Sequence, residues 1–349
     1  MNVSESWNTF LRTQGAVHND DASVRDFGDA AAERRAARDA DVLVDLSPLS
    51  LIRVSGADAK TFLNTQLTND VTALAVDQTQ LAAWCSPKGR MLAIFRVIRR
   101  ADDYLLQLPA PLRDDIIKRL RVYVLRSKVT LESIDDRVIR IGVAGPQAAA
   151  SIQRIAGGVP DVDNSVTTPA LTASRVPGLH PRFEILASLA EAPAIWKTLR
   201  QNATPAGWGA WVWHDIMAGI PVVWPETHEA FVPQMANLDA IGGVNFKKGC
   251  YPGQEIVARV HYRGRIKERM FRAHIEPNEI PKAGESVYAP DLPGQSAGTV
   301  VSAQPSPNGG GDLLAVIHLS SAQTGELRVA RPDGPRLTLE PLPYSVPTP

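Results

Sequence analysis

The spacing of apolar residues along the chain changes character near residue 262. Up to that point, segments with apolar residues every three or four positions, which indicate amphipathic helices, alternate with short apolar runs, which indicate strands. After residue 265, short apolar runs follow one another, separated by Pro, Gly and Asp turns. The pattern predicts helices over 30–40, 59–67, 111–122, 192–201 and 254–259, strands over 41–47, 50–54, 81–84, 91–98, 104–108, 128–134, 138–143 and 183–187, a loose segment over 157–174, and six further strands over 269–275, 286–289, 298–303, 313–318, 327–330 and 336–339.

This change of pattern divides the chain into parts. A length of 349 residues is long for one hydrophobic core, so two or three domains are expected. Residues 1–40 are hydrophilic and form an N-terminal extension in this interpretation. Residues 41–262 form a mixed α/β part, and residues 263–345 form a small β-barrel or sandwich.

Charge and cysteine content narrow the class of protein. The 37 acidic residues balance the 37 Lys and Arg residues, so a polyanion would have to meet a local patch rather than a global positive field. The two cysteines, Cys85 and Cys250, cannot build a disulfide framework, and no apolar run reaches membrane-spanning length. Seven histidines are scattered without the spacing of metal ligands, so we expect no metal site. Together these observations predict a soluble, cytoplasmic protein.

The run of residues 247–255 is the most unusual stretch of the chain. It reads Lys-Lys-Gly-Cys-Tyr-Pro-Gly-Gln-Glu, with a glycine on each side of the Cys-Tyr-Pro core. The glycines allow a sharp turn, and the helix expected after Gly253 would point free N–H groups and positive charge at one spot. Such a loop could receive a carboxylate or an anionic ring edge. The alternative is a surface loop between two domains with a buried, inert Cys250.

Two other stretches each allow two interpretations. Trp208, Trp211 and Trp213 lie within six residues, and they are either an aromatic anchor of the core or a wall for a flat heteroaromatic ring. Basic residues also occupy alternate positions between 259 and 269. On one continuous strand they would form a basic edge for a polyanion, and otherwise they form a solvated face: Arg259, His261, Arg263, Arg265, Lys267 and Arg269.

The stretch Lys248-Gly249-Cys250-Tyr251-Pro252-Gly253-Gln254-Glu255 resembles the signature K-G-C-[FY]-x-G-Q-E of the YgfZ family. Members of this family bind folate and are related to the T-protein of the glycine cleavage system. The resemblance covers about residues 42–345, because further matching segments lie at 55–59, 66–71, 82–90, 218–221, 231–234 and 340–345.

The resemblance implies an α+β fold of the aminomethyltransferase (T-protein) type. Two entwined α/β lobes and a C-terminal small β-barrel would form a cloverleaf around a central hole that admits tetrahydrofolate or a one-carbon derivative. It also implies a role in the upkeep of iron–sulfur enzymes as client proteins, and through them in tRNA modification by thiomethylation. Cys250 would be the reactive atom, with Lys248 favouring its thiolate. The implied folate contacts are Trp211, Lys248, Tyr251, Gln254, Glu255 and Arg259.

Three positions separate this chain from catalytic T-proteins. Family members that transfer aminomethyl groups carry an acidic pair just after the turn that matches Lys88-Gly89, and these places hold Leu92 and Ala93. The glutamate that often precedes Ala-Gly is replaced by Met217. Without a carboxylate near the reacting nitrogen, no obvious group serves the proton transfer that C–N cleavage needs. A folate-dependent aminomethyltransferase or methyltransferase is therefore the second hypothesis, and a nucleic-acid or protein-binding module that uses residues 259–272 is the third.

Overall fold

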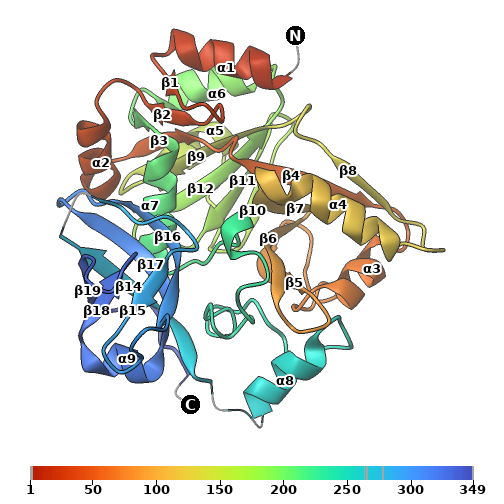
Figure 1. Ribbon diagram of the computed structural model, residues 1–349. Coiled ribbons are helices and arrows are strands. Elements are labelled where there is room, and N and C mark those ends of the chain that lie inside the picture. Colours follow the sequence, from red (N-terminus) through yellow and green to blue (C-terminus); the bar gives the residue numbers. More distant parts are fainter. Residues whose placement is uncertain (1–2, 263, 265, 277–278, 348–349) are drawn as a thin grey trace.

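Two large open sheets, a two-stranded sheet near the N-terminus and a closed barrel make up the fold of the described residues (Figure 1). The computed structural model describes residues 3–262, 264, 266–276 and 279–347. Within these residues, no helix is long and apolar enough to cross a membrane.

The first sheet has the strand order β5-β6-β7-β4-β8, and every pair in it is antiparallel. The hairpin expected at 81–98 is confirmed, with Ala83 opposite Ile94. Its second strand and the next one are almost entirely buried, which explains why both consist of near-continuous apolar runs. The elements are β4 (Leu49–Ser55), α3 (Ala59–Gln66), β5 (Thr79–Cys85), β6 (Met91–Arg99), β7 (Asp103–Pro109), η1 (Ala110–Leu112), α4 (Arg113–Val122) and β8 (Thr130–Ser133).

The second sheet has the order β10-β11-β12-β9-β3-β13, and its only parallel pair among the described residues joins β13 to β3. The loose segment expected at 157–174 is wrong in part, because Ser165 to Thr167 pair with Thr172 to Ser174 as an edge hairpin. The elements are β3 (Val42–Asp45), β9 (Ile139–Ala144), α5 (Ala148–Ala156), β10 (Ser165–Thr167), β11 (Leu171–Val176), β12 (Arg182–Ala187), α6 (Ala192–Leu199), β13 (Thr204–Ala206) and α7 (Trp208–Ala218).

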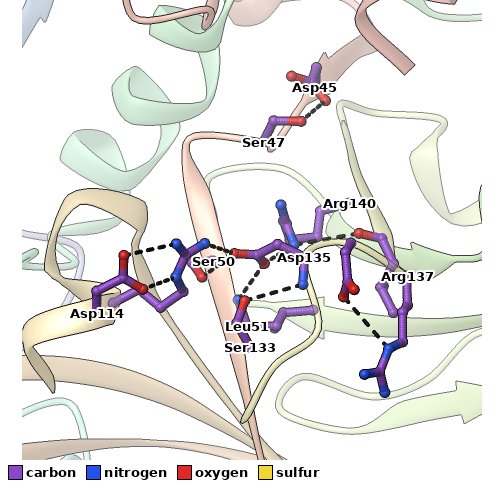
Figure 2. Close-up of polar contacts among 12 residues, drawn as sticks. Asp45, Ser47, Ser50, Leu51, Asp114, Ser133, Asp135, Arg137 and Arg140 are labelled. Carbon is purple, nitrogen blue, oxygen red and sulfur yellow. Dashed lines mark hydrogen bonds and ion pairs between the residues drawn. The ribbon is translucent and has the colours of Figure 1, made fainter. Parts of the chain in front are cut away.

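The chain crosses between the two sheets twice, once after β3 and once before β9. At the second crossing, the carboxylate of Asp135 accepts hydrogen bonds from the Leu51 amide at 3.0 Å, from Arg113 Nη1 and Arg140 Nη1 at 2.6 Å each, and from Ser50 Oγ (Figure 2). Burial alone would raise the pKa of Asp135, but Arg140, Ser50, the Leu51 amide and Arg113 together hold it below its usual value. We call these residues the Asp135 cluster.

The N-terminal residues pack against the second sheet. Trp7 and Leu11 are fully buried there, and Trp7 Nε1 donates a 2.8 Å hydrogen bond to Asp45 at the end of β3. The helix expected at 30–40 is confirmed, and Asp29 caps its first turn through bonds from the amides of Ala31 and Ala32. The elements are α1 (Val3–Thr13), β1 (Val17–His18), β2 (Val24–Asp26) and α2 (Ala30–Asp39).

The barrel after residue 266 closes in the order β14-β17-β16-β15-β18-β19. Its core is aliphatic, from Ala273 and Ile275 to Leu337. Trp213 of α7 ties it to the rest of the fold, because its Nε1 donates to Asp312 at 2.8 Å. The elements are β14 (Glu268–Ile275), β15 (Ser286–Tyr288), β16 (Gly298–Pro305), β17 (Gly311–His318), α9 (Leu319–Thr324), β18 (Leu327–Val329) and β19 (Arg336–Glu340).

The basic edge considered for residues 259–269 does not form. Arg259 and His261 lie on the helix α8 (Gln254–Tyr262), whereas Arg269 lies on β14 and is buried. The Arg269 guanidinium donates to the Asp239 carboxylate at 2.7 Å and to the Gln234 carbonyl at 2.7 Å, so it has no freedom to meet a polyanion. Arg263 and Arg265 lie outside the described residues.

Candidate functional site

The cysteine turn, residues 247–253, runs along the end of the helix α3. The ammonium of Lys248 donates to the carbonyl of Leu67 at 2.7 Å and to that of Asn64, which are acceptors left free at the end of a helix. Burial lowers the pKa of Lys248 to about 8, against the raising effect of Asp70 and Cys250. Lys248 therefore fixes the turn to the first lobe and keeps one of its three donors for other partners.

Lys248 also brings together the other side chains of the turn. Its ammonium lies 4.9 Å from the centre of the Tyr251 ring, in cation–π geometry. The Tyr251 ring is buried, and burial with the nearby Cys85 thiol raises the pKa of its phenol. Cys250 is exposed, so the inert, buried cysteine that was the alternative reading is wrong. An accessible thiol next to an ammonium can act as a nucleophile.

Gly253 of the turn and Gly89 of the β5–β6 hairpin are required by the close approach of these two segments, whereas a Cβ on Gly249 would meet nothing within 4 Å. Gly253 has a φ of +78°, and a Cβ there would lie 2.4 Å from the carbonyl oxygen of Ser86. A Cβ on Gly89 would lie 2.9 Å from Cβ of Ile256. Only glycine allows this contact, which places Cys85 next to Tyr251.

The three predicted contacts on α8 differ in exposure. Gln254 is half-buried, whereas Glu255 and Arg259 are exposed. The helix is held through its buried Val257, whose carbonyl accepts a 2.7 Å bond from Gln234 Nε2, and through the stacking of His261 on Phe246 with ring centres 3.7 Å apart.

Trp211 lies in the core of the second lobe. Its ring packs on Gly142, where a Cβ would come within 2.6 Å of it, and the guanidinium of Arg182 lies 4.5 Å from the ring centre. The indole is buried, so the reading of this residue as a core anchor describes it well. Within the described part of the chain, no hydrogen bond, ion pair or ring contact joins Trp211 to the cysteine turn.

A group of buried polar side chains lies beside Trp211, and the sequence pattern did not predict it. Glu184 lies opposite Gly142 in the sheet, and Arg182 is on the same face of β12. His214 of α7 and Gln107 of β7 complete the group, which we call the open polar cluster. Because these residues come from both sheets and from α7, the cluster lies between the two lobes.

Several polar atoms of this cluster have no hydrogen-bond partner among the described residues. They are Glu184 Oε2, Gln107 Oε1, Arg182 Nε and Nη1, and both ring nitrogens of His214. Arg182 uses only Nη2, which donates to Asp215 Oδ1. Buried polar atoms are almost always paired in folded proteins, so a concentration of unpaired ones indicates a place for a polar ligand.

The same burial shifts the ionisation of two members. Burial raises the pKa of the Glu184 carboxyl, although Arg96 and Arg182 act in the opposite direction. Burial and the charge of Arg182 lower the pKa of His214 to about 3. The imidazole is therefore neutral at pH 7, with one donor and one acceptor nitrogen.

Within the described residues, no group of three or more His, Cys, Asp or Glu side chains is placed to hold a metal ion. The donors and acceptors at hand are instead those that recognise an organic molecule.

Comparison with known proteins agrees with the resemblance to the YgfZ family. Residues 10–175 match the family model of the GCVT N-terminal domain. The tRNA-modifying protein YgfZ of Enterobacter sp. (strain 638) is 34% identical over 309 residues, which cover 87% of this chain and 93% of the relative. The protein of the same name from Edwardsiella ictaluri (strain 93-146) is 35% identical over 303 residues, 84% of this chain and 89% of the relative. This chain belongs to the YgfZ family.

The fold predicted from the YgfZ resemblance is confirmed as well. The structure of the glycine cleavage system aminomethyltransferase T from Bartonella henselae superposes with a TM-score of 0.81 over 98% of both chains, at 17% identity. That likeness shows the shared fold, including the closed C-terminal barrel. At the positions where the resemblance leads us to expect acids in catalytic T-proteins, this YgfZ-family chain has Leu92 and Ala93 buried on β6, and Met217, whose sulfur accepts from Arg272.

One signal could have revealed the open polar cluster. Arg182 and Glu184 alternate with apolar residues in a strand whose other positions are all buried, so both charges had to point inward. The apolar run predicts a strand over 183–187, but it does not show which groups the two charges meet. His214 next to three tryptophans carried a similar signal.

Proposed function

We propose that this chain binds tetrahydrofolate, or a one-carbon derivative of it, between its two lobes and thereby supports tRNA modification. The observation that carries the proposal is the set of unpaired buried atoms on Glu184, Arg182 and His214 beside the Trp211 indole. The proposal follows from matching these atoms to the ligand's chemistry.

The pterin ring of folate fits the open polar cluster in kind. One edge of the ring carries an amino group and a ring N–H side by side, which a carboxylate such as Glu184 can accept from. The neighbouring ring carbonyl suits a guanidinium donor, and two nitrogens of Arg182, Nε and Nη1, are unpaired. When bound, the folate supplies a carrier for one-carbon groups. Toward the other end of the ligand we place the contacts expected on the cysteine turn and α8: Lys248, Tyr251, Gln254, Glu255 and Arg259.

The role in tRNA modification is inferred from the relatives, which are named tRNA-modifying proteins. We infer that the chain acts in the cytoplasm through the upkeep of iron–sulfur enzymes, including those that thiolate tRNA. Cys250 is the residue we assign to that step, because its thiol is exposed beside Lys248. Lys248 orients the turn that carries the thiol.

Binding can be tested by titrating the intrinsic fluorescence of the protein with tetrahydrofolate. We expect a saturable quench at micromolar ligand. A Trp211→Phe variant should lose most of that quench, because Trp211 adjoins the open polar cluster, whereas a variant of Trp7, which bonds to Asp45 and packs in a different core cluster, should keep it. The absence of a saturable quench in the unmodified protein would contradict folate binding.

The cellular role can be tested in a bacterial strain that lacks its own family member. We expect the unmodified chain to restore tRNA thiomethylation and the Cys250→Ser variant to fail, with Cys85→Ala as the matched control. The control retains function in our expectation because burial raises the pKa of Cys85 to about 12, which makes its thiol unreactive. Equal rescue by Cys250→Ser and the unmodified chain would remove Cys250 from the mechanism.

The aminomethyltransferase hypothesis gains no support from the positions that should carry it. Leu92 and Ala93 are apolar and buried, and Met217 is a thioether, so none can transfer a proton to the ligand. Turnover of a methylamine donor with formation of methylene-tetrahydrofolate would reverse this conclusion.

A further inference from the structure

The connection between α4 and β8 exposes apolar side chains that the rest of the fold leaves uncovered. Leu125 is 88% exposed, Val122 69% and Tyr123 45%. Leu125 also has a φ of +45°, a left-handed conformation that is costly for leucine. Clustered apolar exposure and a strained backbone in one short segment are features of functional surfaces.

Positive charge surrounds these apolar residues. The segment 118–128 contains five cationic residues and no acidic one. Arg119 pairs with Asp115, and Arg121 donates to the Leu131 carbonyl. In the described part of the chain, no ion pair engages the side chains of Lys118, Arg126 or Lys128, all of which are exposed. We call residues 121–128 the cationic tip.

The cationic tip is linked to the candidate site through α3. A hollow of about 730 Å³ beside the tip is lined by Asp58, Tyr123, Leu125, Arg126 and Ser127. Asp58 immediately precedes α3, and the other end of that helix holds the Lys248 ammonium. Eight helical residues span about 12 Å.

A second contact also connects the cationic tip to the region of the cysteine turn. The Tyr123 ring packs edge-on against Trp84, the neighbour of Cys85, with ring centres 6.2 Å apart. Figure 1 shows the connection between α4 and β8 projecting from the body of the molecule beyond α3.

We propose that the cationic tip docks a protein whose surface offers an apolar pocket ringed by carboxylates, so that Cys250 faces that partner. This inference rests on the proposed function, which requires a client protein near the thiol. Exposed aliphatic anchors inside a charged ring are the arrangement of an interface hot spot. The cations would steer an acidic partner toward the tip.

The same features disfavour other occupants. Asp58 places a carboxylate in the hollow, which would repel a nucleic-acid phosphate or an anionic lipid headgroup entering there. A second copy of the chain, facing the first across a two-fold axis, would bring two sets of unpaired cations together. A partner protein can instead place a side chain in the hollow and carboxylates around it.

The Leu125→Gly variant separates docking from folding. Glycine removes the most exposed apolar side chain and also accepts the left-handed backbone, so the melting temperature should stay equal or rise. Tetrahydrofolate quenching should be unchanged. Restoration of tRNA thiomethylation in the strain lacking its own family member should fall by about tenfold, as for an interface anchor. The matched control is Leu179→Ser, a 57% exposed leucine elsewhere, which should restore it fully.

Each outcome of this experiment decides something. Equal rescue by Leu125→Gly and the unmodified chain overturns the docking surface. Failure of the unmodified chain to rescue overturns the proposed function, and the docking surface with it. Two binding assays address the other occupants: tRNA affinity lost in Arg126→Glu with Lys128→Glu would make the tip an RNA contact, and sedimentation with phosphatidylglycerol vesicles but not phosphatidylcholine vesicles would make it a membrane contact. Either result overturns the protein partner.

Discussion

Two groups of buried charged residues lie close to the junction of the lobes, and they differ in one respect. In the Asp135 cluster, both carboxylate oxygens of Asp135 accept two bonds each, from the backbone, from a serine and from two arginines. In the open polar cluster, Glu184 and His214 leave three atoms unpaired. Both groups bear the desolvation penalty of burial, but the first recovers most of it through its own bonds and, among the described residues, leaves only Arg140 Nε unpaired. The second is placed to recover it from a ligand.

The largest loss of stability should come from removing the carboxylate of the Asp135 cluster. The change Asp135→Asn removes the charge that compensates Arg113 and the buried Arg140, so the free energy of unfolding should fall by about 3 kcal/mol. Urea unfolding at pH 7 measures it. The control is Asp136→Asn, whose exposed side chain makes one long contact with Arg137 at 3.6 Å and should change the stability little. A stability of Asp135→Asn equal to that of the unmodified chain would refute the structural role.

Replacing Glu184 of the open polar cluster by glutamine should not lower the free energy of unfolding, in contrast to Asp135→Asn. Burial raises the pKa of Glu184, so its contribution to stability is present at low pH and is lost as the pH rises through that raised pKa. At pH 7 the Glu184→Gln variant should therefore be as stable as the unmodified chain, or more so. Its dissociation constant for tetrahydrofolate should rise about tenfold or more, because a charged acceptor contributes about 1.5–3 kcal/mol.

Fluorescence titration and urea unfolding together measure both effects of Glu184→Gln. Glu191→Gln is the control, because Glu191 is exposed at the start of α6. If Glu184→Gln lost stability as Asp135→Asn does and kept its folate affinity, the two groups would be alike and the comparison would fail.

His214 predicts a pH dependence of about 2 kcal/mol. Its pKa of about 3 in the folded protein lies below the ordinary value of 6.5, so the unfolded chain takes up the proton first as the pH falls. The stability from the neutral imidazole is complete above pH 6.5 and declines from there toward pH 3. Between pH 7 and pH 5, the unmodified chain should lose about 2 kcal/mol more than a His214→Phe variant. Urea unfolding at both pH values measures the difference, and parallel losses would show that His214 titrates normally.

The smallest change in stability should come from Lys248, whose ammonium uses two of its three donors in hydrogen bonds. Replacing it by methionine leaves the carbonyls of Asn64 and Leu67 without their cation, which should cost about 1 kcal/mol of unfolding free energy. Lys247→Met is the matched control, because Lys247 is exposed. Equal stabilities of the two variants would mean that the ammonium does not hold the turn to α3.

Local patterns were sufficient to predict much of the fold. Alternating positions defined the β5–β6 hairpin, a helical period defined α2, and turn residues separated the barrel strands. Patterns failed where pairing is remote or turns are absent. The strand β10 is only three residues long and depends on β11, and the basic run at 259–269 alternates in sequence although a helix interrupts it.

In the candidate site too, the part built from contiguous residues was predicted, and the part built from remote residues was not. The cysteine turn carries its own signal, because its glycines, lysine and cysteine are contiguous, and its exposed thiol agrees with the expectation. The environment of Trp211 could not be predicted from its neighbours in the sequence, because its contacts are Gly142 on β9 and Arg182 on β12. The remote groups that favour the charged form of Glu184, Arg96 and Gln107, likewise come from β6 and β7, far away in the chain.

The parallel pairing of β13 with β3 has a consequence for synthesis of the protein. Val42 and Thr204 are partners in that pair, although the ribosome makes them 162 residues apart. The first sheet, complete by residue 133, can assemble early, whereas β3 must keep its outer edge uncovered until residues 204–206 emerge. During that interval the nascent chain displays an unpaired apolar strand, and a chaperone that shields residues 42–45 would act at the moment of greatest risk of aggregation.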